Sequence, residues 1–312
     1  MNGNDSSDNG QAQGGEALEP MRRAGDMSEL RRKLRKLHPT TGQRQPASVR
    51  RHTHKRAPEP EPVWQPPVRE PVKLEEAVAG VETAAPVGGR AYLIRNPLAD
   101  LEAQYHQLSG DLQAALAREE SHLRRLLLGA GATDKLQPQD LIFLDLETTG
   151  LSSTPLFLIG TMEWEDEGLV VNQYLARNYA EEAAVISLLA AAAADKLLLV
   201  SFNGKAYDLP YVQMRAAATG VAFAADFAHC DLLHEARRVW GGRLPDCKLQ
   251  TLERRICGRP RSGDIPGEQI PAAYHEYVRT GNAAEIVDIL RHNVLDLVTL
   301  AELMVKLPPV SG

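Results

Sequence analysis

A strand-like apolar run that ends in two carboxylates constrains this chain more than any other feature. Residues 141–150 read Leu-Ile-Phe-Leu-Asp-Leu-Glu-Thr-Thr-Gly. Because side chains on a strand alternate between two faces, Asp145 and Glu147 share one face while Leu144 and Leu146 point into the interior. Two carboxylates held this close repel each other, and a hard divalent cation relieves that repulsion. The pattern predicts either a metal site or a strand that happens to end in acidic loop residues.

The charge of the chain is unevenly distributed. The 312 residues carry a net charge of −6, whereas the segment Arg22–Arg56 holds twelve Lys or Arg and two acidic residues, a net of +10. The rest of the chain therefore carries −16. A basic arm on an acidic body is typical of a segment that contacts nucleic acid or another polyanion, but also of a solvated disordered terminus.

Composition divides the chain into three parts. Residues 1–89 combine the basic arm with a stretch rich in Pro and Glu, which favours unpacked backbone and predicts a disordered arm and linker. Residues 90–136 carry leucines at helical spacing and predict a helical lead-in packed on the domain that follows. Residues 137–308 alternate strand and helix patterns, which predicts an α/β fold with a mixed sheet flanked by helices.

Hydropathy and cysteine content predict a protein of the reducing cytoplasm that does not enter a membrane. Residues 1–20 are too hydrophilic for a signal-peptide core, and no later stretch has the apolar length of a membrane span. Cys230, Cys247 and Cys257 form no Cys-x-x-Cys pair and leave an odd count. We therefore expect free thiols rather than disulfides or a zinc site.

Periodicity predicts the elements that carry the remaining motifs. The predicted strands span residues 141–146, 156–164, 169–176, 197–202 and 229–233, with a hairpin turn at 166–168. The predicted helices span residues 97–128, 181–195, 206–218, 247–257, 270–280 and 283–306.

Two further acidic signals follow the first. Asp208 opens a predicted helix after a strand that stops at Asn203, and ligands of α/β sheets gather at such strand ends and helix starts. His292 and Asp296 are four residues apart in a helical pattern, so they lie on one face. An imidazole beside a metal-binding carboxylate is suited to taking a proton from water. Each signal alone also fits a helix cap or an ordinary surface pair.

Together, the three signals resemble the motifs of the DEDD exonuclease superfamily of the ribonuclease H-like fold, and most closely its YprB-like members. The matching residues are Asp145, Glu147, Thr148, Thr149 and Gly150, then Phe202, Asn203, Gly204, Lys205, Tyr207, Asp208 and Pro210, and finally His292, Asn293, Asp296 and Leu300. The connecting segments 231–234, 244–245 and 264–267 also resemble that family, and the likeness spans roughly residues 90–306.

The resemblance implies a 3′-to-5′ exonuclease that hydrolyses phosphodiester bonds in DNA or RNA with two divalent ions, Mg²⁺ or Mn²⁺. The implied ligands are Asp145, Glu147, Asp208 and Asp296, whose ions would activate water and stabilise the leaving 3′-oxygen. His292 would orient or deprotonate the attacking water. The residues expected to contact a single-stranded 3′ end are Thr148, Leu151, Asn203 and Lys205. The alternative is a nucleic-acid binding module that keeps the fold and has little or no turnover.

One departure from the family pattern concerns the histidine. The two usual arrangements place a Tyr four residues before the last Asp, or a His five residues before it. In this chain His292 stands four residues before Asp296, and Arg291 stands five before. Because a helix turns by about 100° per residue, His292 takes the place of the tyrosine. Its role as the general base therefore stays open.

Overall fold

The computed structural model describes residues 69–118 and 136–308, except Leu151 and Glu167. The predicted basic arm, Arg22–Arg56, lies outside the described residues, and so does the predicted substrate contact Leu151.

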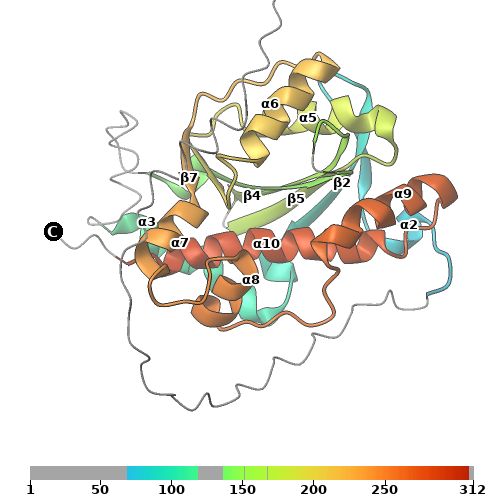
Figure 1. Ribbon diagram of the computed structural model, residues 1–312. Helices are drawn as coiled ribbons and strands as arrows, with labels where there is room; N and C mark the ends of the chain where they lie inside the picture. The colour runs from blue at the N-terminus through green and yellow to red at the C-terminus, as the bar shows by residue number, and fades with distance from the viewer. Residues whose placement is uncertain (1–68, 119–135, 151, 167, 309–312) are drawn as a thin grey trace, which may run out of the picture. The chain divides into compact units, whose positions relative to one another are not determined.

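Seven strands of the described residues form one mixed sheet in the order β1-β2-β5-β4-β3-β6-β7 (Figure 1). The strands are β1 (Val81–Ala84), β2 (Arg90–Pro97), β3 (Leu141–Thr148), β4 (Leu156–Glu165), β5 (Gly168–Leu175), β6 (Leu198–Ser201) and β7 (Ala228–Asp231). Neighbours are antiparallel from β1 to β3, whereas β6 is parallel to β3 and β7 is parallel to β6. The prediction of a mixed α/β sheet flanked by helices is confirmed.

Helices cover both faces of this sheet. They are α2 (Leu74–Ala77), α3 (Leu108–Ala117), α5 (Glu182–Ala192), α6 (Asp208–Thr219), α7 (Leu232–Trp240), α8 (Leu249–Leu252), α9 (Ile270–Thr280) and α10 (Ile286–Lys306). In Figure 1, α5 and α6 lie on one side of the sheet, and α10 crosses the other side together with α7 and α8. A π-helical turn, Glu253–Cys257, follows α8 directly.

The alternation of side chains along β3 decides which layer meets the candidate site. Leu144 and Leu146 belong to a buried cluster that includes residues of α5 and α6. Phe143 belongs to a second cluster with residues of α7 and the middle of α10. Since Asp145 and Glu147 continue the row of Phe143, they face the layer that contains α10.

The stretch from residue 69 to residue 89 differs from the predicted linker. It contains α2 and β1, and β1 pairs with β2. Arg69 Nη2 lies 2.9 Å from Asp288 Oδ1, and the Ala283 amide donates to the Val72 carbonyl at 2.8 Å. The prediction that folded structure begins near Arg90 is therefore wrong. Contacts with residues distant in the sequence impose order on this backbone, although its composition alone favours no packed structure.

The predicted helical lead-in, residues 90–136, is also built differently. Its first residues form β2, which pairs with β5 inside the main sheet. Residues 97–128, predicted as helix, contain two short 3₁₀ turns, Leu98–Asp100 and Ala103–Tyr105, followed by α3. Residues 119–135 lie outside the described residues.

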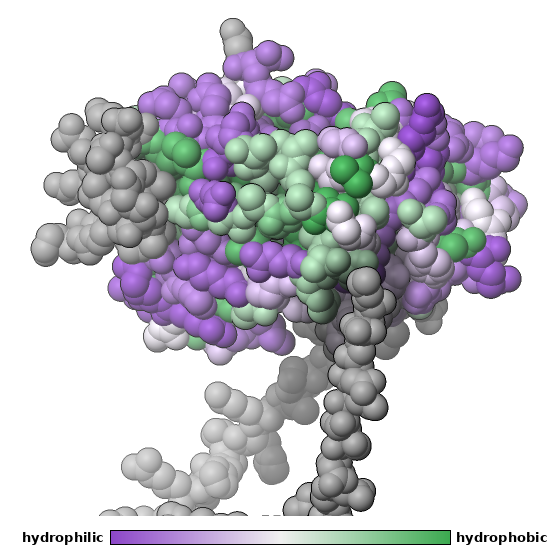
Figure 2. Space-filling view, turned by 90° about the horizontal axis from the view of Figure 1, so that it is seen from above, coloured by the Kyte–Doolittle hydropathy of each residue, from purple (hydrophilic) through white to green (hydrophobic). Residues whose placement is uncertain are grey.

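The face that α5 and α6 form combines hydrophobic and hydrophilic residues. Figure 2 shows a band of weakly hydrophobic residues across it, bordered by strongly hydrophilic ones. On α6, exposed alanines such as Ala217 and Ala218 accompany the larger Met214. None of the described helices is both long enough and apolar enough to span a bilayer.

Candidate active site

The four predicted carboxylates come from three elements. Asp145 and Glu147 lie in the second half of β3, Asp208 is the first residue of α6, and Asp296 lies in the middle of α10. Burial raises the pKa of Asp145 well above its usual range, and the charges of Asp296, Glu147 and Asp208 raise it further. The four side chains are thus close enough to repel one another through low-dielectric surroundings.

The same repulsion acts on the other carboxylates. Burial raises the pKa of Glu147 to about 8, with the nearby positive charge of His292 opposing the shift and the charges of Asp296 and Asp208 adding to it. Burial also raises the pKa of Asp208 to about 7, and the charge of Asp231 contributes. Deprotonating these carboxyls at neutral pH therefore costs free energy, which a bound cation would offset.

Asn293 fixes the position of Asp145, and a glycine makes room for it. Asn293 is fully buried; its Nδ2 donates to Asp145 Oδ2 at 2.7 Å, and its Oδ1 accepts from Gln173 Nε2 at 2.8 Å. Asp145, Gly160 and Gln173 are register partners on β3, β4 and β5. A Cβ on Gly160 would lie 2.1 Å from Asn293 Oδ1. Glycine therefore permits the close approach of α10 to the sheet.

The loop after β6 places Asp208. Asp231, buried at the start of α7, accepts hydrogen bonds from the amides of Asn203 at 2.8 Å and Lys205 at 3.1 Å. Asn203 has a φ of +64°, in the left-handed region that Asn tolerates better than most residues. A Cβ on Gly204 would lie 2.8 Å from Asp208 Oδ2, so the loop backbone packs directly against that carboxylate. Asp231 and Gly204 thereby position the third candidate ligand.

His292 lies between two carboxylates. Its Nδ1 is 2.9 Å from Asp264 Oδ2, and its Nε2 is 3.5 Å from Asp296 Oδ2. Burial lowers the pKa of His292, but the hydrogen bond with Asp264 and the charges of Asp296 and Glu147 outweigh burial and raise it to about 9. His292 is therefore a cation at neutral pH in this arrangement. A protonated imidazole donates hydrogen bonds and accepts none, which suits orientation of a group better than proton removal.

Arg261 is a second cation that the motifs do not include. Its Nη2 forms an ion pair with Asp296 Oδ1, its Nη1 lies 3.0 Å from Asp264 Oδ2, and its Nε pairs with Glu253. Asp296 is thus flanked by Arg261 on one oxygen and His292 on the other. The sequence signal that could have pointed to Arg261 is its position just before the family-like segment 264–267.

The predicted substrate contacts that the structure describes lie in or beside the loop that carries Asn203. The Thr148 hydroxyl donates to the Gly150 carbonyl at 2.8 Å and lies 3.2 Å from the Tyr207 hydroxyl. Asn203 and Lys205 are exposed. Thr148 is therefore joined through Tyr207 to the loop that places Asp208, so these residues lie at one edge of the carboxylate cluster.

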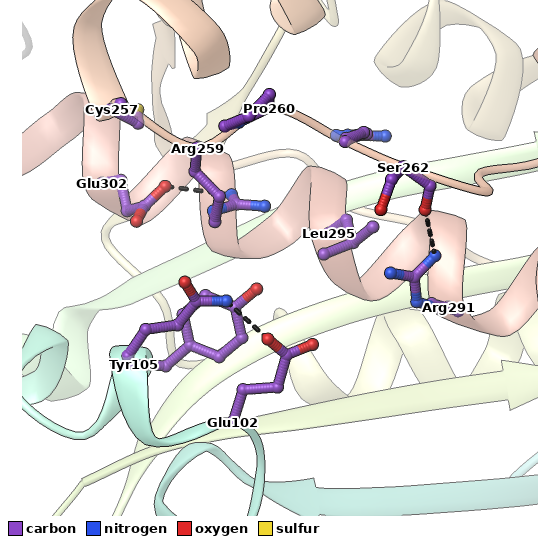
Figure 3. A pocket seen from close by; sticks show the side chains of 12 residues that line it. Glu102, Tyr105, Cys257, Arg259, Pro260, Ser262, Arg291, Leu295 and Glu302 are labelled. Carbon is purple, nitrogen blue, oxygen red and sulfur yellow. Dashed lines mark hydrogen bonds and ion pairs between the residues drawn. The ribbon is translucent and has the colours of Figure 1, made fainter.

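A pocket of about 430 Å³ adjoins Arg261 (Figure 3). Figure 3 shows Arg259 directed toward Glu302 and Arg291 toward the Ser262 carbonyl. Arg259 also pairs with the buried Glu253. Because protein groups already engage Arg259 and Arg291, the pocket offers a ligand no free positive charge from them. These side chains instead hold the segment that carries Arg261.

The chemistry of the carboxylate set fits a hard divalent cation, since it supplies oxygen donors whose mutual repulsion such an ion offsets. Across residues 69–118 and 136–308, apart from the two omitted positions, no three His, Cys, Asp or Glu side chains are grouped closely enough to hold a metal ion. Asp296 is instead engaged by Arg261. To ligate an ion, Asp296 would have to release Arg261.

Comparison with known proteins identifies the family of this chain. Residues 142–308 match the family model of the RNase H superfamily. Over 173 residues the chain is 31% identical to the uncharacterised protein YprB of Bacillus subtilis (strain 168); the match covers 54% of this chain and 42% of that protein. The family B DNA polymerase of Pyrobaculum calidifontis is similar in structure with a TM-score of 0.45 and 16% identity, over 55% of this chain and 25% of the polymerase. RNase H-like nucleases generally use divalent metal ions. This chain belongs to the RNase H superfamily and is similar to YprB over 173 residues.

Proposed function

We propose that this protein is a metal-dependent 3′-to-5′ exonuclease that hydrolyses phosphodiester bonds in single-stranded nucleic acid. The observation that carries the proposal is that Asp145, Glu147, Asp208 and Asp296, from β3, α6 and α10, lie near enough for neighbouring negative charge to raise the pKa of each of the first three. Carboxyl groups placed so near one another that they resist deprotonation are best explained by cations that bind them.

Two divalent ions on these carboxylates would supply an activated water and stabilise the leaving oxygen. The roles of the surrounding side chains follow from their contacts. Asn293 holds Asp145, and Asp231 holds the loop against Asp208. His292, whose Nε2 lies 3.5 Å from Asp296 Oδ2, would orient or deprotonate the attacking water.

The test is digestion of oligonucleotides labelled at the 5′ end. Single-stranded DNA and RNA are incubated separately with the purified chain in Mg²⁺ or Mn²⁺, and we expect a ladder shortened one nucleotide at a time from the 3′ end. Asp145→Asn should lower the rate by about 10³-fold, in the range known for groups that act on the reacting centre. The matched control is Asp195→Asn, whose side chain is 84% exposed. Undiminished digestion by Asp145→Asn would refute the site assignment.

A nucleic-acid binding module without turnover is the second candidate. The pairing of Asp296 with Arg261 and His292 favours it, because these cations already offset part of the carboxylate charge. Under this hypothesis, the chain binds single strands in a salt-sensitive manner and hydrolyses none of them in Mg²⁺ or Mn²⁺. Calorimetric titration with Mn²⁺ separates the two candidates. The nuclease should bind Mn²⁺ and lose that binding in Asp145→Asn, whereas the binding module should show no such Mn²⁺ binding.

A further inference from the structure

A second pocket, of about 400 Å³, opens beside the loop that places Asp208. Its walls include Phe202, Asn203, Leu233, Arg237, Lys248 and Leu249. Asn203 lines this pocket, while the next residue, Gly204, packs against the Asp208 carboxylate. One short loop therefore touches both the candidate active site and the pocket, which places them next to each other.

The pocket wall carries two exposed cations and one carboxylate. Arg237 and Lys248 are exposed, and neither side chain forms an ion pair or hydrogen bond within the described part of the chain. The acidic residue in the wall, Asp246, accepts a hydrogen bond from the Lys248 amide at 3.0 Å, and the positive charge of Lys248 helps to lower the pKa of Asp246. Lys205, also exposed, follows in the shared loop. These exposed cations outnumber the carboxylate beside them, on a chain that is acidic outside its basic arm.

Apolar side chains provide the other part of the pocket wall. Phe202 and Leu249 are partly buried at the edge of a hydrophobic cluster, and Leu233 is buried beside them. An aromatic ring offers a stacking surface to any nucleobase, because every base has a π-face. Cations beside such a surface are suited to the phosphate that joins one nucleotide to the next.

We propose that this pocket binds a nucleotide of the substrate strand adjacent to the one held at the carboxylates. Its base packs on Phe202, and Arg237 and Lys248 hold its phosphate. The inference rests on the proposed nuclease function and names the part of the substrate that lies outside the reacting centre. Exposed cations on a helix are usually only solvated. In this pocket, however, exposed cations in excess of carboxylates, an apolar wall and a loop shared with Asp208 occur together.

Binding measurements test the phosphate contact. The full chain, made inactive by Asp145→Asn, is titrated with a fluorescent single strand of about eight nucleotides at several salt concentrations. Arg237→Glu should weaken binding by about tenfold and reduce the slope of log K against log salt by about 0.7 for each phosphate that the variant no longer neutralises. The matched control is Lys73→Glu, an exposed lysine next to α2 that changes the net charge equally. Equal effects of Arg237→Glu and Lys73→Glu would overturn the proposal.

Fluorescence of a base analogue tests the stacking contact. A strand with 2-aminopurine next to its 3′-terminal nucleotide should change in fluorescence on binding to the Asp145→Asn chain, because the base leaves its neighbours in the strand and stacks on the ring. Phe202→Leu keeps an apolar side chain in the wall and should alter this fluorescence change. If the fluorescence change is the same for Phe202→Leu and its parent, the base does not lie on Phe202.

Hydrolysis of two substrates separates this inference from the proposed function. An otherwise wild-type chain is assayed on the same strand and on the p-nitrophenyl ester of a mononucleotide, which is too short to occupy both places. We expect Arg237→Glu to slow digestion of the strand at least tenfold more than hydrolysis of the ester. Equal losses on both substrates would overturn the pocket assignment. If the wild type cleaves neither substrate, the nuclease proposal fails, whereas the binding and fluorescence results still decide the pocket.

Discussion

The charge state of the candidate site depends on single residues that do not take part in the reaction. Asp264 contacts both His292 and Arg261, the two cations that flank Asp296. Burial raises the pKa of Asp264, but its hydrogen bonds with His292 and Arg261 outweigh burial and lower it below the usual range. A stable negative charge on Asp264 in turn keeps His292 protonated. The imidazole that the sequence suggests as a base is therefore held by its neighbours as an imidazolium.

We predict that removal of the Asp264 charge lowers the pKa of His292. In the metal-free chain, the His292 imidazole should titrate near pH 9, because Asp264, Asp296 and Glu147 together outweigh burial. Asp264→Asn removes the strongest of these contacts, so burial should then bring the pKa down by at least one unit, about 1.4 kcal/mol. Histidine proton resonances followed by NMR measure this, with the exposed His106 as the internal control. An unchanged His292 titration would contradict the assignment.

At the scale of secondary structure elements, the site depends on how closely α10 packs on the sheet. Helix α10 contributes His292, Asn293 and Asp296, and its contact with β3 passes over β4 at Gly160. A side chain at position 160 would push the helix away from the strand that carries Asp145. The position of three candidate functional residues thus depends on the absence of one methyl group.

We predict that Gly160→Ala destabilises the chain and impairs the site. The new Cβ would overlap Asn293, and overpacking of this kind costs about 1–3 kcal/mol. The Asn293 bond to Asp145 should break as a result, so the exonuclease rate should fall by about tenfold or more. The matched control is Gly110→Ala within α3, where nothing lies within 4 Å of the added Cβ. That variant should be stabilised by up to about 1 kcal/mol.

Urea denaturation and the digestion assay measure both variants. Equal free energies of unfolding for Gly160→Ala and the parent chain would show that α10 tolerates the methyl group. In that case the close packing would not explain the position of Asp145.

The elements that the sequence predicts correctly carry their signal in their own side chains. Strands β3, β4 and β5 are runs of Leu, Ile, Val and Phe with turn residues between β4 and β5, and they match their predicted ranges closely. By contrast, the sequence does not predict α7, because Asp231 both ends β7 and caps the helix, which leaves no turn between them. The elements α2 and β1 escape prediction because their order comes from contacts with distant residues.

At the scale of the whole molecule, the predicted parts of the site have a local sequence signal, whereas the unpredicted parts depend on contacts distant in the sequence. The acidic residues at strand ends and helix starts have spacings that show in the sequence, and the fold brings them near one another. Arg261 and Asp264 lie in the connection between the π-helical turn and α9, where no periodicity marks them. They reach Asp296 and His292 only because the chain folds back over α10, so their roles could be found only in the structure.

The charge of the site should also govern the stability of the whole chain. Glu147 and Asp208 have folded pKa values of about 8 and about 7, above their ordinary values of 4.5 and 3.8. Between these limits, the folded state binds more protons than the unfolded state, so stability falls as pH rises. His292 acts in the same direction, since its pKa of about 9 exceeds the ordinary 6.5 and its contribution is lost as pH rises through about 9.

We therefore predict that the metal-free chain melts at a lower temperature at about pH 8 than at about pH 6. Each kcal/mol lost should lower Tm by about 2–4 °C for a domain of this size. Millimolar Mn²⁺ should restore stability at pH 8, because an ion that binds only the folded state stabilises it. Asp208→Asn should flatten the pH dependence and reduce the Mn²⁺ effect, whereas Asp195→Asn should leave both intact. A metal-free Tm that rises between pH 6 and pH 8 would mean that the carboxylates are not held against one another as the fold places them.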